Sequence, residues 1–373
     1  MNRSDLDRNS YMLCGKLAKQ GYMRWRHSFS GYHEITGERR TFFVEYLLLN
    51  PMPEKRSHEK SAPLSYVRVS AGFFPDETSE GLQLHAYYSV QDAKYARKPL
   101  YLQVGRACMS ENRISGLVEI PETVSIQSPL FTDAGTMEWN IEINKTIACH
   151  TGLLASPLFS ALNALDSFWH GEGIRSEMRG TVNLNGEIYI VSPETSYGYA
   201  DKHWGRAFNR PWLQLSSCHL YSERTGKLLK HSALAVDGCC PRFLWFPLRP
   251  KLYFQLTYTG EDFCFSFADA LHPSRLKWGT KESRSRFAWR IKAQNRNTLI
   301  KCSITSIKRE MMYLQYDSPD SDLSRPHKST PLWAGANGIG SIELYRMTAH
   351  GKEWLDTLTV YHAICEFQKP AKT

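Results

Sequence analysis

The sequence predicts an all-β protein made of two consecutive antiparallel barrels, with one or two short helices. Three observations predict this class. The 373-residue chain is 42% hydrophobic and 12% aromatic, which suits strands and is enough apolar material for two cores. Short segments in which apolar and polar residues alternate recur along the chain. A hairpin pattern near the N-terminus also recurs about half a chain later. We expect a first barrel with an N-terminal arm at residues 1–185 and a second barrel at 186–373.

The chain begins with a weak helical signal. Ser4 and Asp7 form a capping pattern ahead of leucines at loose helical spacing, which predicts a short helix or ordered arm within residues 4–20. From residue 22 the hydrophobic period changes to two. Large apolar side chains then share one face of a predicted strand, and arginines and serines share the other.

A turn at Thr36-Gly37 leads into a strand over residues 41–50 that is apolar on both faces and contains Glu45. A carboxylate inside such a strand needs a partner or a chemical role. Pairing with a nearby arginine is the alternative to a chemical role, and Glu45 is a candidate for both.

The rest of the first half predicts short strands around one helix. His85 alternates with apolar neighbours in a strand that is suited to a barrel lumen. Leucines at helical spacing predict a lid or plug at residues 153–165. Asn185-Gly186 predicts a tight hairpin turn. Strands are expected at residues 66–74, 84–90, 100–108, 117–126 and 138–147.

The second half repeats this strand-rich pattern. A polar loop is predicted at residues 317–331, and long helices do not alternate with the strands, which argues against a parallel α/β fold. Strands are expected at residues 212–221, 229–236, 252–258, 262–268, 286–292, 298–308, 341–347 and 357–367.

A repeated sequence segment supports an internal duplication of the chain. Residues 28–37 (SFSGYHEITG) and 217–226 (SCHLYSERTG) match at five of ten positions, with an offset of 189 residues (217 − 28). Both segments read as strand, Thr-Gly turn, strand. We therefore expect the two hairpins to be equivalent in the two barrels, the alternative being chance similarity between two hairpins.

Positive charge is concentrated in one segment. The formal net charge is +9, and residues 275–309 contain eleven Lys or Arg against one acid, Glu282. In residues 284–292 the cations alternate with apolar residues, which predicts an amphipathic strand with a solvated outer face. Such a face can also dock peripherally on an anionic membrane through Arg284, Arg286, Arg290 and Lys292. No nucleic-acid motif accompanies it, so we expect no nucleic-acid partner.

Compartment and cofactors follow from what the sequence contains. No apolar run approaches the roughly 18 residues that span a bilayer, and residues 1–12 do not resemble a signal peptide. We expect a cytoplasmic protein, at most peripheral to the inner membrane face. The nine cysteines are dispersed without metal-ligand spacing. They predict free buried thiols, and we expect neither a metal nor another cofactor.

The most unusual stretch is SYGYADKHWGRAFNRPWLQLSS, residues 196–217. It surrounds Asp201 with large rings, whereas surface loops are usually built from small polar residues. The pattern predicts the wall of a lined cavity.

This stretch, together with GYMRWRHSFSGYHEITGERRTFFVEYLLLNP (21–51) and FWHGEGIRSEMRGTV (168–182), resembles the tocopherol cyclase family. Residues 196–217 carry the most specific part of the resemblance, a Gly-Tyr-x-x-Lys-x-Trp-Gly core followed by an aromatic strand. The resemblance extends to carotenoid hydratases and fungal cyclases with two lipocalin-like, calycin-type barrels. It implies a pocket for a prenylated or otherwise apolar small molecule.

The chemistry that the resemblance implies is metal-free protonation of an isoprenoid double bond, followed by cyclisation or hydration. It needs a carboxylic acid whose pKa is raised by burial, for which Asp201 is the first candidate and Glu45 the second. Lys202 and His203 could instead keep Asp201 ionised in a structural role. A non-catalytic lipid carrier is the main alternative function. The candidate ligand-binding residues are Trp204, Trp212, Trp169, Tyr199, Tyr46, His85, His170, Gln214, Lys202 and His203.

Overall fold

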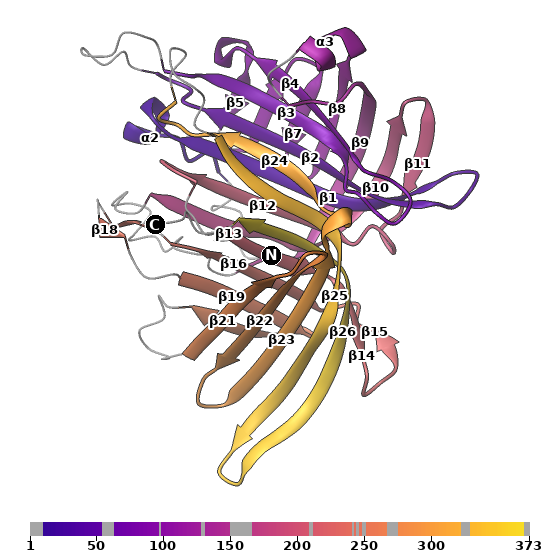
Figure 1. Ribbon diagram of the computed structural model, residues 1–373, viewed down its shortest axis with the longest axis vertical. Helices are drawn as coiled ribbons and strands as arrows, with labels where there is room; N and C mark the ends of the chain where they lie inside the picture. Colours follow the sequence, from indigo (N-terminus) through magenta and orange to yellow (C-terminus); the bar gives the residue numbers. More distant parts are fainter. Residues whose placement is uncertain are drawn as a thin grey trace.

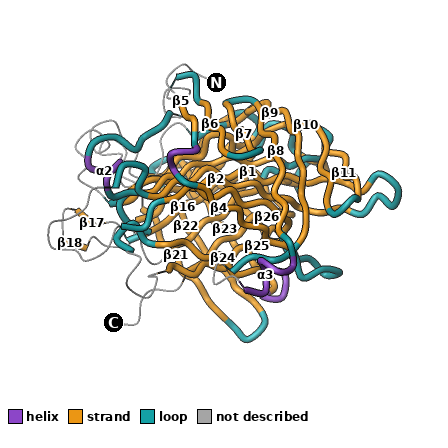
Figure 2. The backbone as a smooth tube through the Cα atoms, turned by 90° about the horizontal axis from the view of Figure 1, so that it is seen from above, coloured by secondary structure: helices purple, strands orange, loops and turns teal. Residues whose placement is uncertain are grey.

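The structure is a computed structural model, and it describes residues 10–53, 63–96, 98–127, 131–149, 166–208, 212–240, 242–243, 246–247, 251–266, 275–321 and 329–368. Within these ranges the chain forms two large antiparallel sheets that lie against each other (Figure 1). The few helices are short and lie at the periphery (Figure 2). The predicted all-β class is therefore confirmed. Among the described residues, no helix has the length and apolar character needed to cross a bilayer.

The first sheet has twelve described strands in the order β4-β3-β2-β1-β11-β10-β9-β8-β7-β6-β5, with β12 pairing with both β1 and β10. Its strands are β1 (Tyr22–His33), β2 (Arg39–Leu49), β3 (Tyr66–Phe73), β4 (Leu82–Tyr88), β5 (Lys94–Ala96), β6 (Tyr101–Val104), β7 (Ala107–Ser110), β8 (Arg113–Ile120), β9 (Gly135–Ile147), β10 (Ser167–Leu184), β11 (Glu187–Val191) and β12 (Gly198–Gly205).

The second sheet also has twelve described strands, in the order β20-β19-β16-β13-β26-β25-β23-β22-β21, with β14, β15 and β24 attached at the side. Its strands are β13 (Trp212–Ser217), β14 (His219–Ser222), β15 (Lys227–Leu228), β16 (Ala233–Cys239), β19 (Lys251–Tyr258), β20 (Glu261–Ser266), β21 (Arg275–Glu282), β22 (Arg286–Gln294), β23 (Thr298–Ile307), β24 (Met312–Asp317), β25 (Ser329–Thr348) and β26 (Gly351–Gln368).

The remaining elements are small. Of the helix expected within residues 4–20, the described part contains only α2, and the helix expected at 153–165 lies outside the described residues. The short elements are the pair β17 (Arg242–Phe243) and β18 (Phe246–Pro247), the helices α2 (Lys16–Lys19) and α3 (Glu122–Gln127), and the 3₁₀ turns η1 (Val90–Asp92) and η2 (Lys308–Glu310).

The strand predicted at 229–236 is wrong in its first half, because β15 ends at Leu228 and β16 begins at Ala233. The strand predicted at 117–126 is wrong in its second half. Strand β8 ends at Ile120, and the helix α3 begins at Glu122. Pro121 lies between them and has no backbone N–H to donate to the sheet. Its carbonyl instead accepts hydrogen bonds from the N–H groups of Val124 and Ser125, which starts the helical turn.

The two sheets differ in closure. In the first, β4 lies beside β8 and β9, and the N–H of Asp133 donates to the carbonyl of Gln83 at 2.9 Å, so the strands close into a barrel. In the described part of the second, β20 and β21 each pair with one neighbour, which leaves a half barrel.

The expected boundary between residues 185 and 186 does not match the division between the sheets. Both β11 and β12 hydrogen-bond to β1 and β10, so residues up to Gly205 belong to the first sheet. The Asn185-Gly186 turn forms the predicted hairpin, with φ of 51° and 93° at its two residues. A tight hairpin joins neighbours within one sheet, so it is a poor marker of a domain boundary.

The two echoed hairpins occupy equivalent places. In the first sheet β1 leads through Gly37 to β2, β3 and β4, and in the second β13 and β14 lead through Gly226 to β15, β16, β19 and β20. The N–H of Gly37 donates to His33 O and that of Gly226 to Ser222 O, both at 2.9 Å. The turn geometry therefore repeats at the same offset of 189 residues (222 − 33) that the sequence shows.

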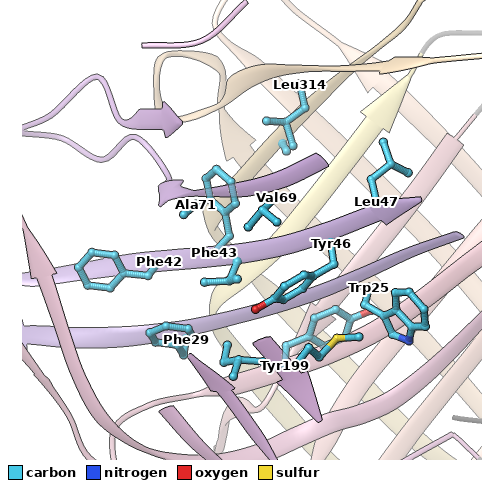
Figure 3. Close-up of a cluster of buried hydrophobic side chains, with 14 of the residues drawn as sticks. Trp25, Phe29, Phe42, Phe43, Tyr46, Leu47, Val69, Ala71, Tyr199 and Leu314 are labelled. Atoms are coloured by element: carbon cyan, nitrogen blue, oxygen red, sulfur yellow. The ribbon is translucent and has the colours of Figure 1, made fainter. Parts of the chain in front are cut away.

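Strand β1 separates two environments. Trp25 and Phe29 face the inside of the first barrel, where Tyr46 reaches across to the carbonyl of Cys108 at 2.9 Å. Figure 3 shows part of this core around Trp25, Phe29, Phe42 and Tyr46. Arg24 and Arg26 lie on the opposite face, toward the second sheet, where both reach Tyr316.

We predict that replacing either hairpin glycine by alanine destabilises the protein by a similar amount. Gly37 and Gly226 have φ of 71° and 64°, and an added Cβ at either would meet no atom within 4 Å. The cost is therefore backbone strain alone, about 1 kcal/mol each by urea unfolding.

Gly279 is the matched control, because it also has open space around it but no positive φ. Gly279→Ala should be neutral or slightly stabilising. Unequal costs at Gly37 and Gly226 would contradict the equivalence of the two turns.

Candidate functional site

The two sheets meet across two rows of polar side chains. On the first sheet, Arg26 lies directly opposite Glu45 of β2 and Asp201 of β12. On the second, Gln214 lies opposite Asp237 of β16 and Glu366 of β26. Side chains directly opposite one another in a ladder point to the same face of the sheet. The two rows therefore form one group, the interfacial cluster, which comprises Arg24, Arg26, Glu45, Arg68, Asp201, His203, Gln214, Asp237, Tyr316 and Glu366.

The interfacial cluster is buried and ionic. Glu45 accepts from Arg26 and from Arg68, both at 3.0 Å. Arg24 lies 3.6 Å from Glu366, which Arg26 also contacts. All five of these side chains are at most 4% exposed. Burial at this level is tolerable only because each charge has an oppositely charged partner.

Tyr316 ties the two sheets together at this cluster. It belongs to β24 of the second sheet, and its hydroxyl donates to Glu45 at 2.7 Å. The same hydroxyl accepts from Arg26 at 2.7 Å. One phenol thus bridges an acid and a base of the first sheet, and this contact fixes the position of β24 over β1 and β2.

Asp201 is bound almost entirely through one oxygen. Its Oδ2 accepts from Trp169 and Tyr199 at 3.0 Å each and from Gln214 at 2.5 Å. Arg24 lies 3.4 Å from the same oxygen. Its Oδ1 is buried and has no hydrogen-bond partner among the described residues. That oxygen remains available as an acceptor.

The pKa values of the two acids predicted as proton donors are lowered. Burial alone would raise the pKa of Asp201, but Arg24 and His203 outweigh it and hold the pKa well below its usual value. Burial likewise opposes ionisation of Glu45, yet Arg26, Arg24 and Arg68 lower its pKa to about 2. The expectation of a raised pKa at Asp201 or Glu45 is therefore wrong, because the arginines of β1 and β3 stabilise the ionised carboxylates.

Asp237 is the acid of the interfacial cluster whose pKa is raised. Burial, together with the charge of Asp201, raises the pKa of Asp237 well above its usual value. Burial also lowers the pKa of His203 to about 3, so its imidazole is neutral. His203 Nε2 lies 3.3 Å from Asp201 Oδ2 and 3.8 Å from Asp237 Oδ1. Asp237, His203 and Asp201 therefore form a series in which one imidazole nitrogen lies near both carboxyl groups.

Aromatic rings border this series. The His203 ring is 4.3 Å from that of Trp212 and 6.3 Å from that of Trp169. Trp169 in turn lies 5.6 Å from Tyr253. These negative ring faces can stabilise a nearby cation, as Trp212 does for Arg24 at 5.3 Å.

The structure divides the predicted site residues between two faces. The alternation of side chains along β2, β10 and β12 causes this division. The residues at the interface are Asp201, Glu45, Trp169, Tyr199, His203, Trp212 and Gln214, with His85 nearby through its 2.8 Å contact to Ser70. The residues on the opposite face, toward the inside of the first barrel, are Tyr46, His170, Lys202 and Trp204.

Lys202 therefore does not pair with Asp201. It lies 3.6 Å from Glu172 and 5.0 Å from the ring of Trp204. Of the two residues expected to keep Asp201 ionised, only His203 contacts it, and Arg24 supplies the positive charge.

Sequence reasoning missed six of the ten residues of the interfacial cluster. Arg24 and Arg26 could have been found, because both alternate with apolar residues in the strand predicted next to Glu45. Asp237, in the apolar segment LAVDG, carries the same signal that identified Glu45. Arg68, Tyr316 and Glu366 lie far away in the sequence, and no local pattern marks them.

The described surface carries grooves of about 980, 400 and 490 Å³. None of these three is lined by the interfacial cluster. None of the nine cysteines forms a disulfide, but the prediction of buried thiols holds for only five of them, because Cys108 and Cys240 are partly buried and Cys14 and Cys264 are exposed. In the part of the chain that the structure describes, no group of three or more His, Cys, Asp or Glu is arranged to hold a metal ion.

Comparisons with known proteins give similarity at the level of overall structure. No family model matches the chain, and no curated protein matches it. A solved structure assigned as AttH from Nitrosomonas europaea aligns over 94% of this chain and 93% of its own, with 11% identity and a TM-score of 0.45. Kievitone hydratase from Nectria haematococca aligns over 93% of this chain and 89% of its own, with 13% identity and a TM-score of 0.48.

The lowered histidine pKa values predict loss of stability in acid. Burial lowers the pKa of His203 to about 3, so this imidazole stays neutral in the folded protein while the unfolded chain protonates it below pH 6.5. Above pH 6.5 the imidazole is neutral in both states. As the pH falls from 6.5 toward 3 the unfolded chain binds one proton more than the folded protein, so the free energy of unfolding decreases. We expect His203→Gln to reduce the slope of unfolding free energy against pH in this window by about 1.4 kcal/mol per pH unit.

Urea unfolding at a series of pH values measures this slope. His33→Gln is the control, because His33 is a partly exposed histidine at the end of β1, outside the cluster. If His203→Gln leaves the slope unchanged, the imidazole is not held neutral.

Proposed function

We propose that this protein binds an apolar, prenylated or similarly unsaturated small molecule between its two sheets and protonates it without a metal, leading to hydration or cyclisation. Asp237 is the proton donor. The observation that supports this proposal is the series of Asp237, His203 and Asp201, buried among tryptophan and tyrosine rings. A neutral carboxylic acid at neutral pH is what such a reaction requires.

The proposed reaction has three steps: protonation, capture of the cation and return of the proton. Asp237 gives its proton to one carbon of a double bond, and a tertiary cation forms at the other carbon. Water captures the cation in a hydration, or a phenol oxygen of the same molecule captures it in a cyclisation. The proton released by that oxygen returns to the carboxylate of Asp237, which restores the acid.

The neighbouring groups support these steps. Trp169, Trp212 and Tyr253 present rings that stabilise a cation and exclude water. Asp201 Oδ1 is an acceptor without a partner among the described residues, and it can hold a hydroxyl group of the ligand. Asp201 itself stays ionised because of Arg24, and thus takes an orienting role.

A ligand carrier is the second candidate. It is favoured by the ion pairing of the interfacial cluster, which is sufficient to explain Arg24, Arg26, Glu45 and Arg68 as structural residues. A carrier would need no proton transfer. The two functions therefore differ at Asp237, which makes no ion pair with a described Lys or Arg.

We predict that Asp237→Asn abolishes turnover and retains ligand binding. The test uses prenylated hydroquinones incubated in deuterated water, with mass spectrometry of the products. Both reactions place one deuterium on carbon, and hydration also adds one oxygen from the solvent. Asp237→Asn keeps the shape of the side chain but cannot donate the proton, so product formation should fall by at least about 100-fold.

Asp356→Asn is the matched control. Asp356 is also a fully buried aspartate of the second sheet, but it is bound by Ser222 and Tyr258 away from the cluster. Its replacement should affect stability more than product formation per folded protein. Binding without product in the wild type would establish the carrier, and an unchanged rate in Asp237→Asn would exclude this residue as the donor.

A further inference from the structure

A cationic face on β21, β22 and β23 lies outside the interfacial cluster. Phe287, Trp289 and Ile291 of β22 are buried in the core of the second sheet, so the residues between them point outward. The outward cations of the three strands define what we name the cationic face: Arg275, Lys277, Lys281, Arg286, Arg290, Lys292 and Lys301.

Like charges are directly opposite each other on the cationic face. Lys292 of β22 lies opposite Lys277 of β21 on one side and opposite Lys301 of β23 on the other. Like charges at such positions destabilise a sheet. Lys301 is compensated by Glu343 at 2.7 Å. No carboxylate among the described residues lies within 4.0 Å of Lys277, Lys292 or Arg290, so these cations are available to an anionic partner.

Exposed apolar and aromatic residues extend the same face. Ile339 of β25 lies opposite Thr305 of β23 and is 55% exposed. Tyr345 lies opposite Trp354 of β26, which is 48% exposed near the tip of the long β25–β26 hairpin. Figure 1 shows this hairpin extending away from the first barrel. Cations beside exposed tryptophan and aliphatic side chains are typical of surfaces that bind lipid.

We propose that the cationic face docks on the surface of an anionic lipid bilayer. The cations bind lipid phosphates and carboxylates, and Trp354 and Ile339 enter the headgroup region. A groove of about 490 Å³ between Lys277, Arg290, Lys292 and Lys301 offers space for a headgroup. An exposed isoleucine adds affinity for acyl chains and none for a phosphodiester backbone, which favours lipid over nucleic acid. This proposal does not depend on the proposed enzymatic function.

The test is co-sedimentation of the full chain with vesicles of phosphatidylcholine, with and without phosphatidylglycerol. We expect binding only to the anionic vesicles and its loss at high salt, because surface charges are screened. The triple variant Lys277→Glu, Arg290→Glu and Lys292→Glu should bind at least about tenfold more weakly. Trp354→Ala should weaken binding without changing its salt dependence.

A matched control reverses three exposed cations elsewhere, Arg106→Glu, Lys227→Glu and Lys230→Glu, which changes the net charge equally. This control should bind like the wild type. Equal loss in both triple variants would indicate an effect of net charge alone and would overturn the proposal. So would vesicle binding that needs no anionic lipid, or binding of duplex DNA, and not of vesicles, through the same three cations.

Discussion

The structure depends on burying three guanidinium groups between two sheets. Arg24, Arg26 and Arg68 are almost fully inaccessible, and each would be prohibitively costly without a partner. Glu45 and Asp201 come from the neighbouring strands of the first sheet, whereas Glu366 and Tyr316 come from the second. Because the partners come from both sheets, the ion pairs specify how the sheets lie against each other. An apolar interface of similar area would specify this arrangement less strictly.

The chemistry of the site follows from the same constraint. The arginines stabilise the charges of the acids that they contact, and this lowers the pKa of Glu45 and Asp201. Asp237 is buried, has no such partner among the described residues and lies near the charge of Asp201, so its pKa is raised. Asp201, the acid of the central stretch at residues 196–217, is therefore ionised and is not suited to donate a proton. We propose as the proton donor a carboxyl group of the second sheet, that of Asp237.

The sequence predicted the strands and the faces of individual strands well, because alternation is a local property. It predicted the turn equivalence of Gly37 and Gly226 because both turns need the same backbone conformation. It failed where position depends on strand order. Tyr46, Lys202 and Trp204 seemed to belong with Asp201, but one residue along a strand reverses the face. Tyr316 and Glu366 reach the cluster only through the fold of the second sheet, and no local pattern could identify them.

The protonation state of Asp237 tests this account most directly. Infrared difference spectroscopy of wild type against Asp237→Asn and against Asp201→Asn at neutral pH would measure the carbonyl stretch of a protonated carboxyl group. We predict that this band is present in the wild type, disappears in Asp237→Asn and persists in Asp201→Asn. A band that is absent from the wild type, or that disappears with Asp201 instead, would contradict the account.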